Sequence, residues 1–341
     1  MSDTEDLPKR PSPFHRGERA IQERLGLATK AEDIGRRFIR DAMPEEHAEF
    51  FEALAWVVLA SLDPSGHPAI TLFGKHSGFA SAPDAQTLKF SGLPDPSDPV
   101  LAGLTEGQPV GVLGIQLHDR RRNRVNGRVT DVTDVTDATD ATDATDVSLD
   151  SHDTEGGFSI DVDQSFGNCP AYIQKRNEES LADSAPTIAL EPADDLTARR
   201  RFVERADTFF IASRSSGDEQ DHPAGVDASH RGGRPGFVRQ EENAALIFPD
   251  FSGNKFFNTL GNINEDPRVA LVFPDFENGD LLHLKGRAEI VWAGAALEAF
   301  AGAERLIRVS IESAYWRRNA MPFRAGDPQP SPALKRTGTW S

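Results

Sequence analysis

The polar residues best suited to chemistry follow an apolar run in the last third of the chain. That run ends at Pro249, and Ser252-Gly253-Asn254-Lys255 then leads into a segment with the apolar spacing of a short helix. The unpaired N–H groups of a helix's first turn and its positive dipole end favour a bound anion, as does a neighbouring lysine. The pattern therefore predicts that Ser252, Asn254 and Lys255 hold a phosphate-bearing ligand.

A second polar cluster, Ser229, His230 and Arg231, ends the strand predicted upstream. A neighbouring strand could aim these side chains at the same anion. The alternative for both clusters is an ordinary solvated strand end or helix start. Ligand binding is the preferred interpretation at Lys255, because a cation, a glycine and a helix start coincide there. For Arg231 and His230 both interpretations stay open.

Two further candidates stand beside these clusters. Arg120-Arg121-Arg122 is predicted to lie in a hairpin turn, where a run of charge is usually solvated, although it could reach a ligand across an interface. The lone Cys169 fits a small buried apolar residue better than a reactive thiol, and a role beside a ligand is the alternative. The histidines show no metal-ligand spacing, and the sequence has no nucleophile elbow and no Walker loop.

The elements that must position these residues are mainly strands, and the two halves of the chain echo each other. Val110 and Val269 begin two apolar strands, and a Gly-Arg pair follows each of them at the same interval, at Gly127 and Gly286. Short matches arise by chance, but their common order and spacing favour a duplicated unit. Asn278-Gly279 is typical of a hairpin turn, because both residues tolerate positive φ.

The chain of 341 residues is too long for one typical core and suits two domains. Val/Ala-Thr-Asp triplets fit neither strand nor helix, so they predict a solvated or disordered insertion; a metal site on these aspartates is a minor alternative. The predicted parts are an N-terminal helical extension (1–43), a first barrel (44–176) with the acidic triplet insertion (131–146), a linker (177–195) and a second barrel (196–330) with a C-terminal helix at 295–315.

The composition excludes several classes of partner. A net charge of −17 argues against nucleic acid and anionic membranes, whose phosphates demand a basic face. No apolar run approaches the ~20 residues of a membrane span, and the polar N-terminus shows no secretory signal. A cytoplasmic protein is therefore expected, and its acidity favours a salt-adapted host over an ordinary acidic protein. One cysteine excludes an internal disulfide framework.

Four segments of the second half resemble the pyridoxamine 5′-phosphate oxidase-like, flavin-binding split-barrel family: 228–238, 249–255, 259–262 and 266–268. The resemblance implies a mainly β fold of two tandem FMN-binding split barrels that form a pseudo-dimer within one chain. It also implies that the FMN phosphate is held by Ser229, His230, Arg231, Ser252, Asn254 and Lys255. The equivalent turn of the first barrel, 93–99, carries two extra carboxylates that would repel a phosphate, so one flavin per chain is expected.

The resemblance also has departures. Asp280-Leu281 stands where the oxidase has an Arg-Gln pair, and the arginine motif that grips the oxidase's substrate is not recognisable at 315–319. Oxidation of pyridoxamine phosphate is therefore not carried over. The implied function is an FMN-dependent oxidoreductase that acts on a small molecule, with a nicotinamide as candidate electron donor, in a monomer or homodimer. The alternatives are a non-catalytic flavin- or haem-binding carrier or sensor, and a structural barrel pair whose site has decayed.

Overall fold

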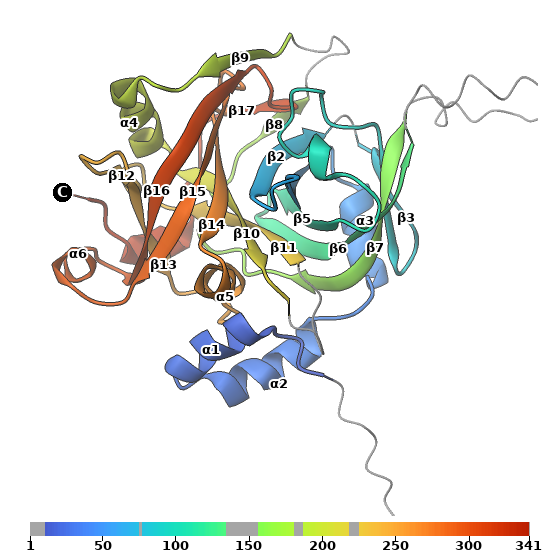
Figure 1. Cartoon of the computed structure of the whole chain (residues 1–341), viewed down its shortest axis with the longest axis horizontal. Helices are drawn as coiled ribbons and strands as arrows, with labels where there is room; N and C mark the ends of the chain where they lie inside the picture. The colour runs from blue at the N-terminus through green and yellow to red at the C-terminus, as the bar shows by residue number, and fades with distance from the viewer. Residues whose placement is uncertain (1–10, 75–76, 134–155, 181–186, 218–224, 341) are drawn as a thin grey trace, which may run out of the picture.

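The protein is mainly β in a computed structural model (Figure 1), which describes residues 11–74, 77–133, 156–180, 187–217 and 225–340. Three helices precede the first strand, and the first two lie below the barrels in Figure 1, next to α5 of the second half. These helices are α1 (Arg16–Arg24), α2 (Ala28–Phe38) and α3 (Glu45–Glu52).

The first half forms one antiparallel sheet in the order β2-β1-β5-β6-β7-β4-β3. Its strands are β1 (Trp56–Leu62), β2 (Pro68–Gly74), β3 (Ala80–Asp84), β4 (Thr87–Ser91), β5 (Pro109–Gln116), β6 (Arg121–Thr133) and β7 (Gly157–Gly167). Between β4 and β5 the chain forms a single 3₁₀ turn, η1 (Leu101–Gly103).

The second half repeats this order strand for strand, as β11-β10-β14-β15-β16-β13-β12. Its strands are β10 (Thr208–Ser215), β11 (Gly225–Gly232), β12 (Arg239–Gln240), β13 (Leu246–Phe251), β14 (Arg268–Pro274), β15 (Leu281–Val291) and β16 (Ala303–Arg318). The register repeats too, because Val110 pairs with Gly127 and Val269 with Gly286. The predicted repeat is therefore present as two split barrels in tandem.

Shorter elements connect and extend the two barrels. The helices of the second half are α4 (Leu196–Arg205), α5 (Asn258–Glu265) and α6 (Ala295–Glu298), and the chain ends with the 3₁₀ turn η3 (Pro332–Arg336). β9 (Ala189–Pro192) adds to the side of β16, and β8 (Glu178–Ser180) pairs with β17 (Phe323–Ala325). The β8–β17 pair therefore ties the connection between the barrels to the end of the second one.

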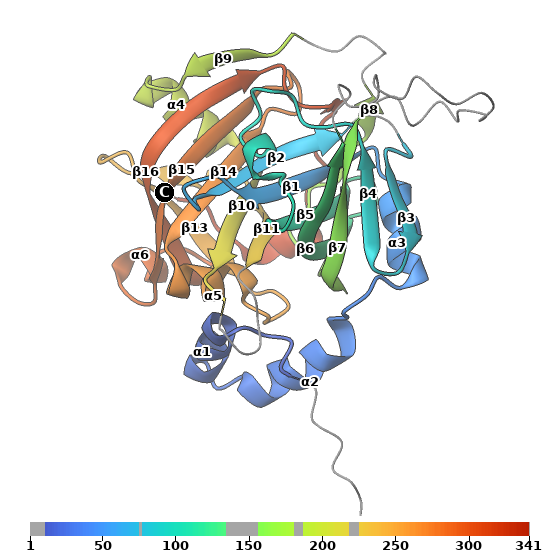
Figure 2. The same ribbon diagram turned by 45° about the vertical axis from the view of Figure 1, so that its right-hand side comes forward.

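Each barrel has its own apolar core, and a third cluster lies between the barrels. β1 is buried along its whole length because alternate residues face opposite sides: Val57 and Leu59 belong to the first core, whereas Trp56 and Val58 belong to the interface. β5 and β11 approach so closely that a Cβ on Gly111 would lie 2.5 Å from the carbonyl of Val226. The barrels therefore pack face to face (Figure 2).

The helix predicted at 295–315 is wrong. Only Ala295–Glu298 is helical, and β16 occupies the rest as the central strand that pairs with both β15 and β13. The β-branched residues Ile307, Val309 and Ile311 alternate with polar ones, a period of two that fits a strand rather than a helix. In β15, His283 alternates with the apolar Leu282 and Leu284, a pattern that predicts a solvated side chain, but His283 is 3% exposed at the barrel interface.

Parts of the predicted insertion, linker and N-terminal extension lie outside the described residues, namely 134–146, 181–186 and 1–10. Of the insertion, 131–133 complete β6, and of the linker, 189–192 form β9. The predictions for the remaining residues, and the domain boundaries, stay predictions.

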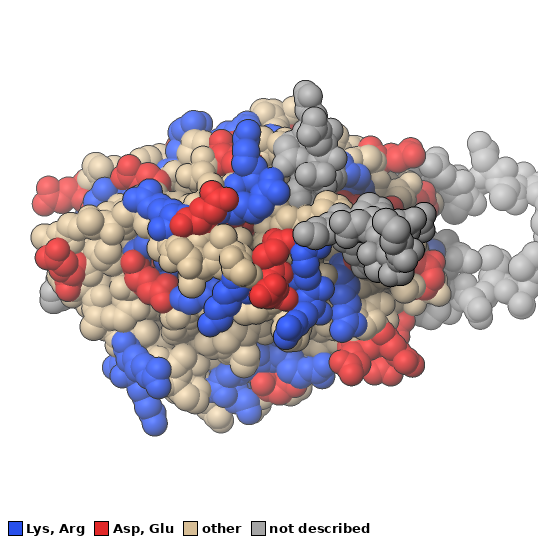
Figure 3. Space-filling view, turned by 90° about the horizontal axis from the view of Figure 1, so that it is seen from below, with Lys and Arg blue, Asp and Glu red and all other residues tan. Residues whose placement is uncertain are grey.

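The surface below the barrels carries both signs of charge. Figure 3 shows basic side chains interspersed with acidic ones on this face, without the continuous basic stripe that nucleic acid requires. In the described part of the chain, no helix is long and apolar enough to cross a membrane. The described residues also hold no group of three or more His, Cys, Asp or Glu side chains arranged to bind a metal.

Candidate functional site

One pocket at the interface of the two barrels collects the six residues that were expected to hold a phosphate. The second barrel supplies the strand end of β11, the loop after β13 and the start of α5. The first barrel supplies β6 and the segment after β7. The predicted residues that line the pocket are Ser229, His230, Arg231, Ser252, Asn254 and Lys255.

The strand β11 presents its three predicted residues in two directions. Ser229 and Arg231 lie on one face and His230 on the other, as alternation along a strand requires. β11 is the edge of its sheet, so both faces can border the pocket. The Ser229 hydroxyl contacts Thr259 of α5 at 3.1 Å, and Arg231 binds Asp250 at 2.6 Å.

The first barrel contributes two arginines from β6. Arg122 and Arg124 are two residues apart on one face of the strand, together with Asn126. Arg124 donates to Asp227 at 2.9 Å and to Ser229 at 2.5 Å, and Asn126 donates to Asp227 at 2.7 Å. The two halves of the chain therefore meet at this pocket through a buried ion pair.

Arg122 differs from Arg124 because no hydrogen bond or ion pair satisfies its guanidinium among the described residues. Its Nε is buried without a partner. Burial lowers the pKa of Arg122 to about 10, and repulsion from Arg124 and Arg231 contributes to the same shift. A half-buried guanidinium that keeps its charge without a counterion favours an anionic ligand strongly.

His230 is buried and neutral. Both of its ring nitrogens lack a partner among the described residues. Burial holds the pKa of His230 well below its ordinary value, and the charges of Arg122 and Arg231 lower it further. The ring can therefore offer a hydrogen bond to a ligand near neutral pH, but no positive charge.

The loop after β13 does not open the helix directly, as the sequence had suggested. α5 begins only at Asn258, so Ser252 to Lys255 precede its first turn. Lys255 and Phe257 both adopt left-handed backbone conformations, with φ of 68° and 67°. Lys255 Nζ donates to Ser252 Oγ at 3.0 Å and to the Glu304 carboxylate at 2.7 Å. The lysine therefore borders the pocket with a counterion already present.

The charges around the pocket do not cancel. Asp250 pairs with Arg231 and with its cross-strand neighbour Arg305, whose Nη2 lies 2.8 Å from the carboxylate. Among the described residues that line or pair across the pocket, five cations face three carboxylates, which leaves a surplus of two positive charges. The cations are Arg122, Arg124, Arg231, Lys255 and Arg305, and the carboxylates are Asp227, Asp250 and Glu304.

The segment after β7 closes one side of the pocket over the loop. The Tyr172 ring stacks on Phe251 with centroids 5.0 Å apart, and its hydroxyl donates to the carbonyl of Ser252 at 3.1 Å. Asn254 donates to the side-chain oxygen of Asn168 at 3.3 Å. The interpretation of Cys169 as a small buried residue is wrong, because Cys169 is exposed and lines the pocket as well.

The equivalent place on the first barrel, which we call the first crevice, is filled by side chains from both barrels, Asp98 of the first and Arg317 of β16 in the second. Asp98 of the 93–99 turn is buried and accepts hydrogen bonds from Thr71 at 2.7 Å, the Val100 N–H at 2.9 Å and Arg317 at 2.5 Å. Burial raises the pKa of Asp98, although Arg317 opposes the shift. The two carboxylates expected at this turn are present, and Asp95 lies 3.7 Å from the same guanidinium.

Arg124, Arg305 and the pocket role of Tyr172 escaped the sequence reasoning. Arg122 was placed in a hairpin turn with Arg120 and Arg121, but β6 begins at Arg121 and so aims alternate residues at the second barrel. The alternation of Arg122, Arg124 and Asn126 within a strand was the available signal. Arg305 was missed because residues 295–315 were predicted to be a helix, whereas Arg305 lies on the strand β16.

Comparisons with known proteins point to one family. Residues 197–322 match the family described as Pyridoxamine 5′-phosphate oxidase. A search of curated protein sequences gives no significant match.

Solved structures with similar folds have low sequence identity. HupZ from Group A Streptococcus is 15% identical, covering 35% of this chain and 90% of that protein, with a TM-score of 0.27. A candidate pyridoxamine 5′-phosphate oxidase of Lactobacillus delbrueckii is 15% identical, with 37% and 95% covered and a TM-score of 0.27. The Bacillus subtilis inhibitor of motility MotI/DgrA is 10% identical, with 76% and 88% covered and a TM-score of 0.21.

Proposed function

Through its second barrel the chain belongs to the pyridoxamine 5′-phosphate oxidase-like family, and on this premise we propose that it is an FMN-dependent oxidoreductase. Proteins of this family generally bind a flavin. The single observation that carries the proposal is Arg122, an unpaired guanidinium from one barrel that faces the lysine-bearing loop of the other.

The residues of the pocket fit FMN in charge and in chemistry. A phosphate monoester is close to a dianion at neutral pH, and the pocket has a surplus of two positive charges. The orphaned nitrogens of Arg122 and His230 supply donors that need an acceptor. Ser252, Asn254 and Lys255, with Ser229, His230 and Arg231 on β11, are the residues that would hold the phosphate.

Bound FMN would supply the electron chemistry, and the protein would supply binding, orientation and electrostatics. Arg122 and Arg124 approach from the first barrel, opposite the loop. A guanidinium with no protein counterion stabilises negative charge on a ligand more strongly in a half-buried site than in water. His230 adds a hydrogen bond without adding charge. The substrate is a small molecule, and the electron donor would be a nicotinamide.

The absorbance spectrum of the purified full chain, alone and with added FMN, tests the proposal. A flavin spectrum, followed by bleaching during anaerobic titration with NADH or NADPH, is the expected result. A protein that is colourless and does not bind added FMN contradicts the function. Bound flavin that neither NADH nor NADPH reduces, and that forms no peroxide, favours the non-catalytic carrier instead.

Replacement of Arg122 gives a sharper test of the site. Arg122→Ala should weaken FMN binding about ten- to a hundredfold, since a hydrogen bond to a charged group contributes about 1.5–3 kcal/mol. The ligand-free variant should be at least as stable as the wild type, because an unpaired half-buried charge is removed. Flavin fluorescence titration and thermal denaturation measure the two effects. Arg121→Ala is the matched control, and equal affinity in both variants would remove Arg122 from the site.

A further inference from the structure

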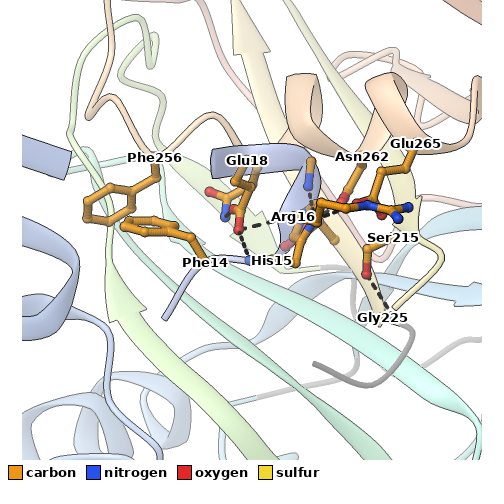
Figure 4. Close-up of polar contacts among 12 residues, drawn as sticks. Phe14, His15, Arg16, Glu18, Ser215, Gly225, Phe256, Asn262 and Glu265 are labelled. Atoms are coloured by element: carbon orange, nitrogen blue, oxygen red, sulfur yellow. Dashed lines mark hydrogen bonds and ion pairs between the residues drawn. The ribbon is translucent and has the colours of Figure 1, made fainter. Parts of the chain in front are cut away.

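The N-terminal helix α1 packs against α5 and the pocket loop, although Gln22 and Phe256 are 234 residues apart in sequence (Figure 4). The two helices are in close contact at a pair of glycines. A Cβ on Gly17 would lie 2.3 Å from the carbonyl oxygen of Gly261. α1 therefore lies directly on the element that begins at the pocket.

Three buried side chains of the N-terminal segment hold the end of the loop. Gln22 Nε2 donates to the carbonyl of Phe256 at 3.3 Å, and the Glu18 carboxylate accepts a hydrogen bond from the Asn258 side chain. The ring of Phe14 packs on Phe256 with centroids 5.4 Å apart. Glu18 is itself oriented by the N–H of His15 at 3.0 Å. Neither Glu18 nor Gln22 lines the pocket, whereas Asn258 does.

The loop needs such support because its backbone is strained. Lys255 and Phe257, on either side of Phe256, have φ of 68° and 67°. A left-handed conformation at a residue other than glycine costs about 1–3 kcal/mol and persists only where the surroundings fix it. The first barrel fixes the start of the loop through Asn168 and Tyr172. The N-terminal segment fixes its end.

We propose that Glu18 and Gln22 are positioning residues of the pocket, which hold Phe256 and Asn258 so that the strained loop presents Lys255 and its N–H groups to a phosphate group. They act through the loop and do not touch the ligand. The proposal rests on the proposed function for the identity of the ligand, FMN, but not for its phosphate chemistry.

The test compares FMN with riboflavin, which lacks the phosphate, on the full chain. Gln22→Met keeps the volume of the side chain and removes the donor, and Glu18→Ala removes the acceptor. Each should weaken FMN binding about tenfold and riboflavin binding less than twofold. Glu18→Gln keeps an acceptor for Asn258 and should recover most of the affinity. Glu23→Ala, an exposed residue on the same helix, is the control.

The outcomes separate this proposal from the proposed function. Suppose that the wild type binds FMN and that the ratio of FMN affinity to riboflavin affinity is the same in Gln22→Met and Glu18→Ala. The positioning role is then overturned, and the flavin function stays intact. If the wild type binds no FMN, inorganic phosphate is the probe in thermal denaturation. If phosphate raises the unfolding temperature of the wild type but not of Gln22→Met, the positioning role is supported. If phosphate raises both unfolding temperatures equally, or neither, the positioning role is overturned. If one of the two variants Gln22→Met and Glu18→Ala does not fold, the other is read by the same ratio.

Discussion

The two crevices between the barrels are built from equivalent positions but differ in what fills them. Counted along the matched strands, Thr71 corresponds to Ser229, and Arg317 to Asn168. In the crevice near Thr71, Arg317 and Asp98 satisfy each other inside the protein. In the crevice near Ser229, Arg122 has no counterion among the described residues. We infer that the Asp98 carboxylate occupies the position that a ligand anion takes on the other side.

This difference explains how one ligand per chain can be specified without any change of fold. A carboxylate held by a hydroxyl, a backbone N–H and a guanidinium has the same partners as a bound phosphate. In the first crevice the anion is the Asp98 carboxylate of the protein itself. In the second crevice the anion must be a ligand that binds from solution. Three predictions follow from this contrast, beginning with the one of largest effect.

Removal of the Asp98 carboxylate, the anion of the first crevice, should destabilise the protein. Asp98→Asn leaves Arg317 buried without a counterion, and breaking a buried pair in this way costs about 3–5 kcal/mol. Denaturation by urea measures the loss. Asp95→Asn, on the same turn but partly exposed, should cost less than about 1 kcal/mol. Added sulfate should stabilise Asp98→Asn more than the wild type; equal stability of Asp98→Asn and the wild type would contradict the comparison.

Each crevice holds one buried histidine, and the effect of a bound anion on the pH dependence of stability should distinguish the two. Burial, with neighbouring arginines, holds the pKa of His230 and of His283 well below 6.5. The unfolded chain takes up these protons near pH 6.5 and the folded chain does not. Stability is therefore present above pH 6.5 and is lost as the pH falls below it, by up to about 1.4 kcal/mol per histidine and pH unit.

Sulfate should reduce the His230 contribution, because a bound anion offsets the charges of Arg122 and Arg231. It should leave the His283 contribution unchanged, because Arg317 already has Asp98. Urea denaturation at pH 7, 6 and 5, with and without sulfate, isolates each contribution by comparing His230→Asn and His283→Asn with the wild type. An equal effect of sulfate on both histidines would show that the crevices do not differ in this way.

The smallest expected effect concerns the rim of the open pocket. Glu304 binds Lys255 at 2.7 Å, and both side chains are partly exposed. Glu304→Gln releases the lysine for the ligand, so FMN affinity should rise a few-fold, since exposed pairs contribute about 0.2–1 kcal/mol. Lys255→Ala should lower the affinity. Glu298→Gln, which changes an exposed residue without a pocket contact, is the control. If Glu304→Gln instead binds FMN more weakly than the wild type, Glu304 does not compete with the ligand for Lys255.

The sequence predicted those features that local patterns determine. Trp56–Leu62, for example, is an apolar run that ends in a turn signal, a pattern that predicts a strand, and it forms β1 with these bounds. The loop at Ser252 and the strand end at Ser229 were recognised because each cluster is continuous in sequence. Their meeting in one pocket was an expectation of the split-barrel resemblance, and the geometry agrees with it.

The features that escaped prediction depend on distant contacts. Glu18 and Gln22 act on a loop that follows more than two hundred residues later, and no local pattern indicates this. The strand β16 was mistaken for a helix because the short helix α6 precedes it, and the helical period was read onward from there. Arg317 lies in the segment 315–319, where the sequence showed no recognisable substrate-binding motif, and it is the counterion of Asp98.

The tandem arrangement of the barrels has a thermodynamic consequence. In a homodimer of single barrels every substitution appears twice, so a pair such as Asp98 and Arg317 would close both crevices at once. A covalent tandem lets one crevice change alone. With a single open crevice per chain, a monomer should bind FMN along a simple hyperbola with a Hill coefficient of one at every protein concentration. A homodimer would bring two such crevices together, and a Hill coefficient that differs from one or changes on dilution would reveal it.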